Sequence, residues 1–285
     1  MRALRSAAAV AAAAALVLAG CSSSSSTETS TQASTDTTAT TELVTLKVGA
    51  SPSPHAKILQ FIQDNLAADA GLNLEIVEYS DYIQPNVALN TGELDANFFQ
   101  TVPYLNDQAA EYGYDFVPGE GVHLEPLAIY SEKITDLAQF PDGGTVGIIA
   151  DVTNQARALK LLEAEGFIKI TNPDASNADI NINTVEKLKN FEFKEVEGAQ
   201  LVRSLADVDI AVINGNFAQE GGLSQANDGL AIEPTENNPA ANLLVWPKDP
   251  EKADAIAKLE ELLHTDAVRE YITSTWTDGS VIPTF

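Results

Sequence analysis

Apolar positions along the chain follow two spacings in turn, one typical of strands and one typical of helices. Short apolar runs and period-two alternation predict strands at 46–50, 74–79, 95–99, 145–150 and 209–213. Spacings of three and four residues predict helices around 58–66, 86–90, 158–162, 256–263 and 266–272. Strand and helix signals in this order favour an α/β fold with ligands at the carboxyl ends of the strands.

The strand and helix signals form two units of the same kind. Each unit opens with a strand, a turn and a helix, and each later has a short acidic segment leading into a strand, at 93–97 and at 207–211. Two such units that face each other enclose a cleft, and a cleft between domains is a common ligand site. We expect a first lobe from 43–128 plus a C-terminal return at 228–285, and a second lobe from 129–227.

The first residues have the layout of a secretory signal. Two arginines precede an apolar stretch at 7–18, which is short for a membrane span, and small residues follow. The run Leu18-Ala19-Gly20-Cys21 resembles a bacterial lipobox, a signal in which the cysteine thiol receives a diacylglycerol group. We therefore expect 1–20 to be a lipoprotein signal peptide and Cys21 to be the lipidated N-terminus. The alternative is an ordinary signal peptide beside a chance cysteine.

The segment after Cys21 cannot form a core. Of the 20 residues from Ser22 to Thr41, 15 are Ser or Thr, and none has an apolar side chain larger than that of Ala. We expect 21–42 to be a flexible tether that holds the folded part near the extracytoplasmic face of the cell membrane, with lipid as the only anchor. Because the chain has no second cysteine, no intramolecular disulfide is expected.

The charge balance excludes one class of partner. The chain carries 41 acidic residues against 16 lysines and arginines, a net charge of −25. Nucleic acid is not expected as a partner, because a phosphate-binding face needs a stripe of basic residues. A solvated surface is the simpler interpretation of so many carboxylates.

Polar residues after two apolar strands are candidates for a ligand site. Arg157 lies in the first turns of the helix after 145–150, where the helix dipole favours an anion and the guanidinium fork suits a carboxylate. Asn214 and Asn216 follow the strand at 209–213, and an amide can serve both ends of a zwitterion. A surface arginine and a common Asn-Gly turn are the alternative interpretations.

No catalytic set, cofactor motif or metal motif stands out. The sequence contains no Gly-x-Ser-x-Gly elbow and no Walker-type loop, and lipidation would leave no free thiol. The three histidines, His55, His123 and His264, lie far apart in the sequence without metal-type spacing. We therefore expect no enzyme activity, no cofactor and no metal, and interpret each histidine as a structural or surface residue.

Several stretches taken together resemble the methionine-binding lipoprotein family, also called the NlpA family. The resemblance covers nearly all of 46–285. The matching stretches are YSDYIQPN at 79–86, GELDANFFQ at 92–100, VHLEP at 122–126, TNQARAL at 153–159, EGAQL at 197–201 and AVINGNFA at 211–218. Their number and shared order make the resemblance specific.

The resemblance implies a two-lobed periplasmic-binding-protein fold, type II-like, that closes on its ligand. By position, Arg157 would grip the ligand carboxylate, and Asn216 and Asn242 would bind the amino and carboxylate groups. Aromatic rings would line the side-chain pocket: Tyr82, Phe99 and Tyr104. The resemblance also implies the partners, namely methionine or a related amino acid, a membrane permease and its ATPase subunit.

Two positions depart from the family pattern. Thr101 stands where the family usually has His, and Ala240 stands where Tyr is common. Both changes remove ring surface from the expected pocket, which Thr101 would line, whereas the groups that grip an α-amino acid are kept. Methionine is the expected cargo, as the L form and with the D form left open. A bulkier or more polar amino acid, or a short peptide, is the alternative.

Three other function classes stay open at the level of the sequence. An exported hydrolase would need a nucleophile and a base in the cleft. A metal-capturing lipoprotein would need clustered His, Asp or Glu. A surface adhesin without a solute would show no ligand-induced rise in melting temperature.

Overall fold

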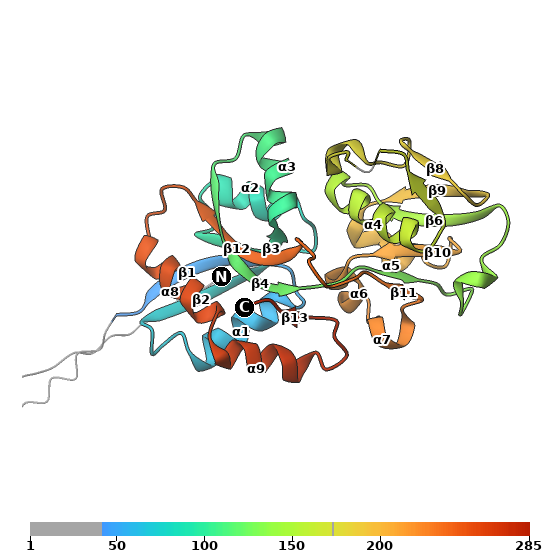
Figure 1. Cartoon of the computed structure of the whole chain (residues 1–285). Helices are drawn as coiled ribbons and strands as arrows, with labels where there is room; N and C mark the ends of the chain where they lie inside the picture. The colour runs from blue at the N-terminus through green and yellow to red at the C-terminus, as the bar shows by residue number, and fades with distance from the viewer. Residues whose placement is uncertain (1–41, 173) are drawn as a thin grey trace, which may run out of the picture. The chain divides into compact units, whose positions relative to one another are not determined.

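The computed structural model describes residues 42–172 and 174–285. These residues belong to one compact unit, in which two mixed sheets form the framework (Figure 1). The expected signal peptide at 1–20, the lipidated Cys21 and the tether at 21–42, apart from its last residue, lie outside the described residues. Within the part that is described, no helix combines the length and the apolar character needed to cross a membrane.

The first sheet combines N-terminal and C-terminal strands. Its strands are β1 (Val44–Ala50), β2 (Leu72–Glu78), β3 (Ala96–Thr101), β4 (Phe116–Leu124), β12 (Ala241–Pro247) and β13 (Ile282–Pro283), in the order β13-β4-β12-β3-β1-β2. β1 is parallel to β2 and β3, whereas β12 is antiparallel to β3 and β4. The strands predicted at 46–50, 74–79 and 95–99 are thus confirmed as β1, β2 and β3.

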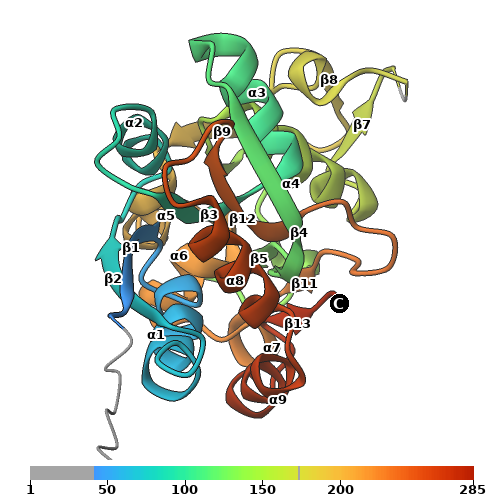
Figure 2. The same ribbon diagram turned by 90° about the vertical axis from the view of Figure 1, so that its left-hand side faces the viewer.

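Helices cover both faces of this sheet. They are α1 (His55–Asn65), α2 (Gln84–Asn90), α3 (Val102–Tyr112), α8 (Ala253–Leu263) and α9 (Asp266–Thr275). The apolar sides of α1, α8 and α9 pack in one cluster that includes Leu244 of β12. Figure 2 labels these three helices. Residues of α2 and α3 pack in another cluster with Leu243 and Val245. Because successive strand residues point to opposite faces, β12 is buried on both sides.

The second sheet has the order β11-β5-β10-β6-β9. Its strands are β5 (Ala128–Tyr130), β6 (Gly144–Ile149), β9 (Phe191–Val196), β10 (Ile210–Ile213) and β11 (Ala231–Ile232), and a separate pair is formed by β7 (Ile168–Ile170) and β8 (Val185–Lys187). β6 runs parallel to both of its neighbours, β9 and β10. The strands predicted at 145–150 and 209–213 are thus confirmed as β6 and β10.

Helices also pack on both faces of the second sheet. They are α4 (Val152–Ala164), α5 (Leu201–Ser204), α6 (Gly215–Glu220) and α7 (Gln225–Asp228), with short 3-10 turns η1 (Leu137–Gln139), η2 (Asn177–Asp179) and η3 (Gly198–Gln200). Apolar residues of α4 lie in one core cluster, and those of α5 and α6 lie in another. Asp151 caps α4, because its carboxylate accepts a hydrogen bond from the backbone N–H of Asn154 at 2.9 Å.

Two segments connect the sheets. Residues 125–127 join β4 to β5, and residues 233–240 join β11 to β12. β11 pairs with β5, so the C-terminal return to the first sheet begins only with β12. The predicted lobe boundaries, 43–128 plus 228–285 and 129–227, stay a prediction. These two crossing segments position the site described next.

Candidate ligand-binding site

All the residues predicted to bind a ligand line one cavity. They are Tyr82, Phe99, Thr101, Tyr104, Arg157, Asn216 and Asn242. The cavity, called the inner pocket below, has a volume of about 30 Å³, which leaves room for about two water molecules. The structure therefore brings the predicted residues together, and their individual roles toward a ligand stay a prediction.

The sheets explain why these residues meet. Phe99 and Thr101 lie at the carboxyl end of β3, and Asn242 of the antiparallel β12 pairs directly with Thr101. Asn216 follows β10, and Arg157 comes from α4, the helix that follows β6. These side chains thus gather at strand ends or just beyond them, where α/β folds place their ligands.

Arg157 is already paired within the chain. Its Nε donates to Oε1 of Glu233 at 2.7 Å, and its Nη2 donates to Oε2 of Glu233 at 2.5 Å and to the backbone oxygen of Glu125 at 2.7 Å. The two charged side chains are only 14% and 11% exposed. Arg157 therefore fastens both crossing segments to α4. Among the described residues its Nη1 donates no hydrogen bond, so one nitrogen stays available to a ligand.

The aromatic wall is held by hydrogen bonds as well as by packing. The hydroxyl of Tyr82 donates to Oδ1 of Asn216 at 2.6 Å, and the hydroxyl of Tyr104 donates to the backbone oxygen of Tyr82 at 2.9 Å. The ring of Tyr82 also stacks on Phe217 of α6, with ring centroids 4.7 Å apart. Burial raises the pKa of Tyr82 well above its usual value, so its hydroxyl remains a donor.

The two lobes also touch beside the pocket. Thr153 at the start of α4 donates its hydroxyl to the carboxylate of Asp107 on α3. Ser53, just before α1, donates to Oε1 of Gln219 on α6 at 3.0 Å. These contacts join elements that pack on the first sheet to elements that pack on the second.

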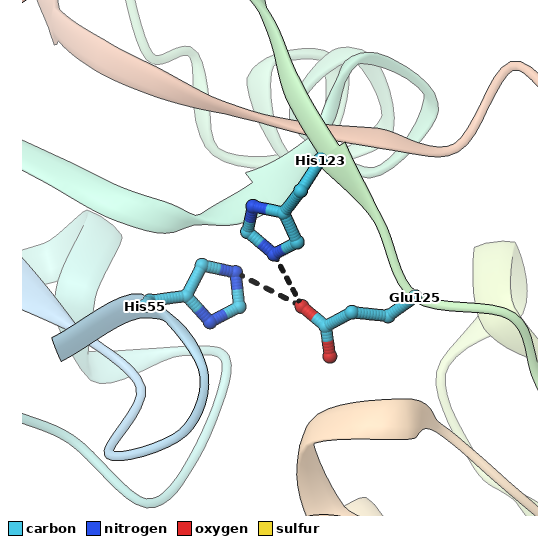
Figure 3. Close-up of side chains that lie close together, drawn as sticks. All are labelled: His55, His123 and Glu125. Carbon is cyan, nitrogen blue, oxygen red and sulfur yellow. Dashed lines mark hydrogen bonds and ion pairs between the residues drawn. The ribbon is translucent and has the colours of Figure 1, made fainter. Parts of the chain in front are cut away.

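A buried carboxylate that lines the inner pocket, Glu125, is held from behind by two histidines. Nε2 of His55 lies 3.3 Å and Nε2 of His123 lies 2.8 Å from Oε1 of Glu125 (Figure 3). His55 opens α1, His123 lies near the end of β4, and Glu125 begins the first crossing segment. Oδ1 of Asn242 lies 3.1 Å from Nε2 of His55, which links this group to the predicted site residues.

Burial sets the charge of this group. It lowers the pKa of His55 to about 4 and that of His123 to about 3, so both rings are neutral at pH 7. It raises the pKa of Glu125 to about 7, although His55 and Arg157 favour the ionised form. Neutral imidazoles can donate their Nε2–H groups to the carboxylate. The arrangement therefore orients a carboxylate that can accept a ligand's ammonium group.

The same three residues are the one grouping of metal-ligand type found among the described residues, with ligand atoms within 4.8 Å of one another. Two histidines and a glutamate can hold zinc. A ligating histidine, however, normally donates its second ring N–H to a partner, and Nδ1 of His55 and Nδ1 of His123 have no partner. The group therefore fits a hydrogen-bonded carboxylate better than a metal centre.

Sequence reasoning missed several of these residues. His55 and His123 are too far apart in the sequence for their contact to be predicted. His264 lies elsewhere, with Nδ1 2.8 Å from the backbone oxygen of Glu260. One signal was available: His123 and Glu125 are two residues apart, a spacing that places side chains on the same face of a strand. Glu233 lies in an irregular segment and has no such signal.

Comparison with known proteins places the chain among lipoproteins. The family described as NlpA lipoprotein matches residues 46–285. Methionine-binding lipoprotein MetQ of Bacillus subtilis is 36% identical over 243 residues, which are 83% of this chain and 86% of the relative. The similarity therefore extends over almost the whole folded part.

Solved structures agree with this result. A lipoprotein from Actinomyces odontolyticus is 62% identical, with a TM-score of 0.82 over 85% of this chain and 100% of that one. A nutrient binding protein from Burkholderia cenocepacia bound to methionine is 34% identical, with a TM-score of 0.79 over 84% of this chain and 100% of that one. The two-lobed α/β fold expected from the sequence is confirmed.

Proposed function

This chain belongs to the NlpA lipoprotein family, and from that premise we propose that it is a lipid-anchored receptor that binds methionine and delivers it to an ABC importer. Cys21 would carry the lipid, and 21–42 would be the tether on the extracytoplasmic face. The permease and its ATPase subunit would be the partners in the membrane. Capture changes no covalent bond, so the proposed role needs no catalytic group.

One observation carries the proposal: groups of opposite charge face the same small pocket. Arg157 and Glu125 both line it, and the amides of Asn216 and Asn242 lie with them. A free amino acid is a zwitterion, so its carboxylate can accept from Nη1 of Arg157 while its ammonium donates to Glu125.

The rings of the pocket suit an apolar side chain. Tyr82, Phe99 and Tyr104 have centroids between 5.7 and 6.0 Å apart, so they form one continuous aromatic wall. A thioether sulfur makes favourable contacts with aromatic rings. Methionine is larger than the inner pocket, so binding requires the lobes to part about the two crossing segments and to close again.

Two measurements test this function. Native mass spectrometry of the purified chain should detect one bound amino acid, and its release should identify methionine. L-methionine should also raise the melting temperature in proportion to the logarithm of its concentration above Kd. D-methionine, leucine and glutamate complete the panel. If no amino acid raises the melting temperature of protein shown to be free of ligand, the proposed function is wrong.

A metal-capturing role is the second candidate, because His55, His123 and Glu125 converge. It predicts one equivalent of zinc in the purified protein and the loss of that zinc in His123→Asn. Cobalt substitution would show the coordination by its absorption spectrum. The unpartnered Nδ1 atoms weigh against this role, and metal analysis that finds no stoichiometric ion would remove it.

A further inference from the structure

A second cavity adjoins the inner pocket. Its volume is about 270 Å³, and it shares Thr101, Asn154 and Arg157 with the inner pocket. We call it the outer chamber. Its apolar wall consists of Pro103, Leu161, Ala164, Pro234, Pro239 and Ala240. Because Arg157 is the proposed carboxylate grip, the chamber begins where a bound amino acid would present its carboxyl end.

One face of α4 leads from the inner pocket into the chamber. Asn154, Arg157, Lys160, Leu161 and Ala164 line one or both cavities, and they follow the spacing of three and four residues that places side chains on one helix face. Arg157 and Lys160 are separated by a rise of about 4.5 Å along the helix. One extended peptide residue spans roughly 3.3–3.6 Å. The backbone positions of Arg157 and Lys160 are therefore spaced by little more than one residue of an extended peptide.

The charges along this face differ. The charge of Arg157 is compensated by Glu233, so its spare Nη1 suits a neutral carbonyl as well as a carboxylate. Lys160 donates to Oδ1 of Asn177 at 2.8 Å, and among residues 42–172 and 174–285 it pairs with no carboxylate. The uncompensated cation therefore lies in the chamber, one turn beyond the amino-acid grip.

Small side chains leave the passage open. Thr101 lines both cavities, and Ala240 lines the chamber with 4% of its surface exposed. We infer that this receptor also takes a dipeptide whose first residue is methionine. The inference rests on the proposed methionine site and extends it by one residue toward Lys160.

The ligand's groups then have assigned partners. The methionine ammonium meets Glu125, and its side chain meets the aromatic wall. The peptide carbonyl accepts from Arg157, and the terminal carboxylate meets Lys160. The second side chain packs on prolines and Leu161, surfaces that fit many apolar side chains.

Calorimetry with L-methionine, Met-Ala and Ala-Met tests the assignment. We expect Met-Ala to bind within tenfold of methionine and at least tenfold more tightly than Ala-Met. Lys160→Ala should weaken Met-Ala at least fivefold and leave methionine within twofold. Lys169→Ala, which removes another exposed lysine of the same lobe, should change neither affinity.

Substitutions that fill the chamber should distinguish the binding of Met-Ala from that of methionine further. Ala240→Tyr should weaken Met-Ala at least tenfold more than it weakens methionine. Since Ala240 is buried, the exposed Ala164→Phe provides a second block that leaves the core untouched.

The possible results distinguish the two proposals. If the parent protein binds methionine but not Met-Ala, the dipeptide inference fails and the methionine receptor stands. If Met-Ala binds but none of the three variants weakens it, the ligand does not lie in the chamber and the inference also fails. If neither ligand binds, the methionine receptor itself fails.

Discussion

The inner pocket and the outer chamber share one wall but are built in opposite ways. The inner pocket has about 30 Å³ of space, and its polar side chains bind one another, as Tyr82 binds Asn216 and Asn214 binds Asn154. The outer chamber has about 270 Å³, and prolines, alanines and a leucine line it together with polar residues such as Lys160 and Asn177. The difference suggests that fixed polar groups recognise the constant part of an amino acid, while a loose apolar space accepts what varies.

Removal of Glu233 should have the largest effect on folding, because it is the partner of Arg157 between α4 and the second crossing segment. We expect Glu233→Ala to lower the free energy of unfolding by about 3 kcal/mol, since it leaves a buried guanidinium unpaired. Urea denaturation measures this change. Glu236→Ala, in the same segment but exposed, is the control. Equal effects of the two substitutions would show that the ion pair has no special role.

The affinity for methionine should depend on pH through Glu125. A ligand ammonium favours the ionised carboxylate, whose pKa is raised to about 7 by burial. Affinity should therefore rise as pH increases through 7, and it should fall roughly tenfold between pH 7.5 and pH 6. Calorimetry at several pH values measures this dependence, which Glu125→Gln should abolish together with part of the affinity.

A second carboxylate near the pocket needs a separate control. Burial also raises the pKa of Glu220 to about 7, and its Oε1 accepts from Nδ2 of Asn216 at 3.4 Å. The pKa values of His55 and His123 lie well below this range. Asp151, which accepts a hydrogen bond from Asn154 of the pocket, is a third carboxylate to control, because burial raises its pKa to about 6. If Glu220→Gln abolishes the pH dependence and Glu125→Gln does not, the ammonium contact has been assigned to the wrong residue.

The smallest predicted effect concerns the aromatic wall. Tyr82→Phe keeps the ring and removes the hydrogen bond to Asn216. We expect a loss of about 1 kcal/mol, or roughly fivefold in methionine affinity. Tyr112→Phe removes the hydroxyl of a residue that is 52% exposed, and it should leave the affinity for methionine unchanged. A loss larger than that of Glu125→Gln would mean that the amide, rather than the carboxylate, dominates recognition.

Local patterns predicted the elements that depend on local sequence. β1, β2, β3, β6 and β10 came from apolar runs, and α1, α4, α8 and α9 came from helical spacing. A C-terminal return to the first lobe was expected, but β12 itself and its antiparallel pairing with β3 and β4 were not, because this pairing joins residues that are far apart in the sequence. α3 was also missed, although Thr101 caps it and a proline opens it.

The candidate site divides in the same way. Asn216 was a candidate because it follows an apolar strand, whereas Asn242 and the roles of both amides came from the family resemblance. The role of Glu233 and the outer chamber could not be predicted, because both depend on the segment 233–240 lying beside α4. Sequence reasoning did identify Thr101 and Ala240 as places where ring surface is lost. The structure shows the space that lies beside them.

The central claim is that Arg157 grips the ligand, and calorimetry of Arg157→Ala with L-methionine tests it most directly. Arg203→Ala, an exposed arginine of the same lobe, is the control, and circular dichroism must show both variants folded at the temperature used. We predict a loss of about 100-fold for Arg157→Ala, since truncating one partner of a buried charged contact costs 2 kcal/mol or more, and no change for Arg203→Ala. An affinity for methionine within threefold of the parent protein would contradict the account.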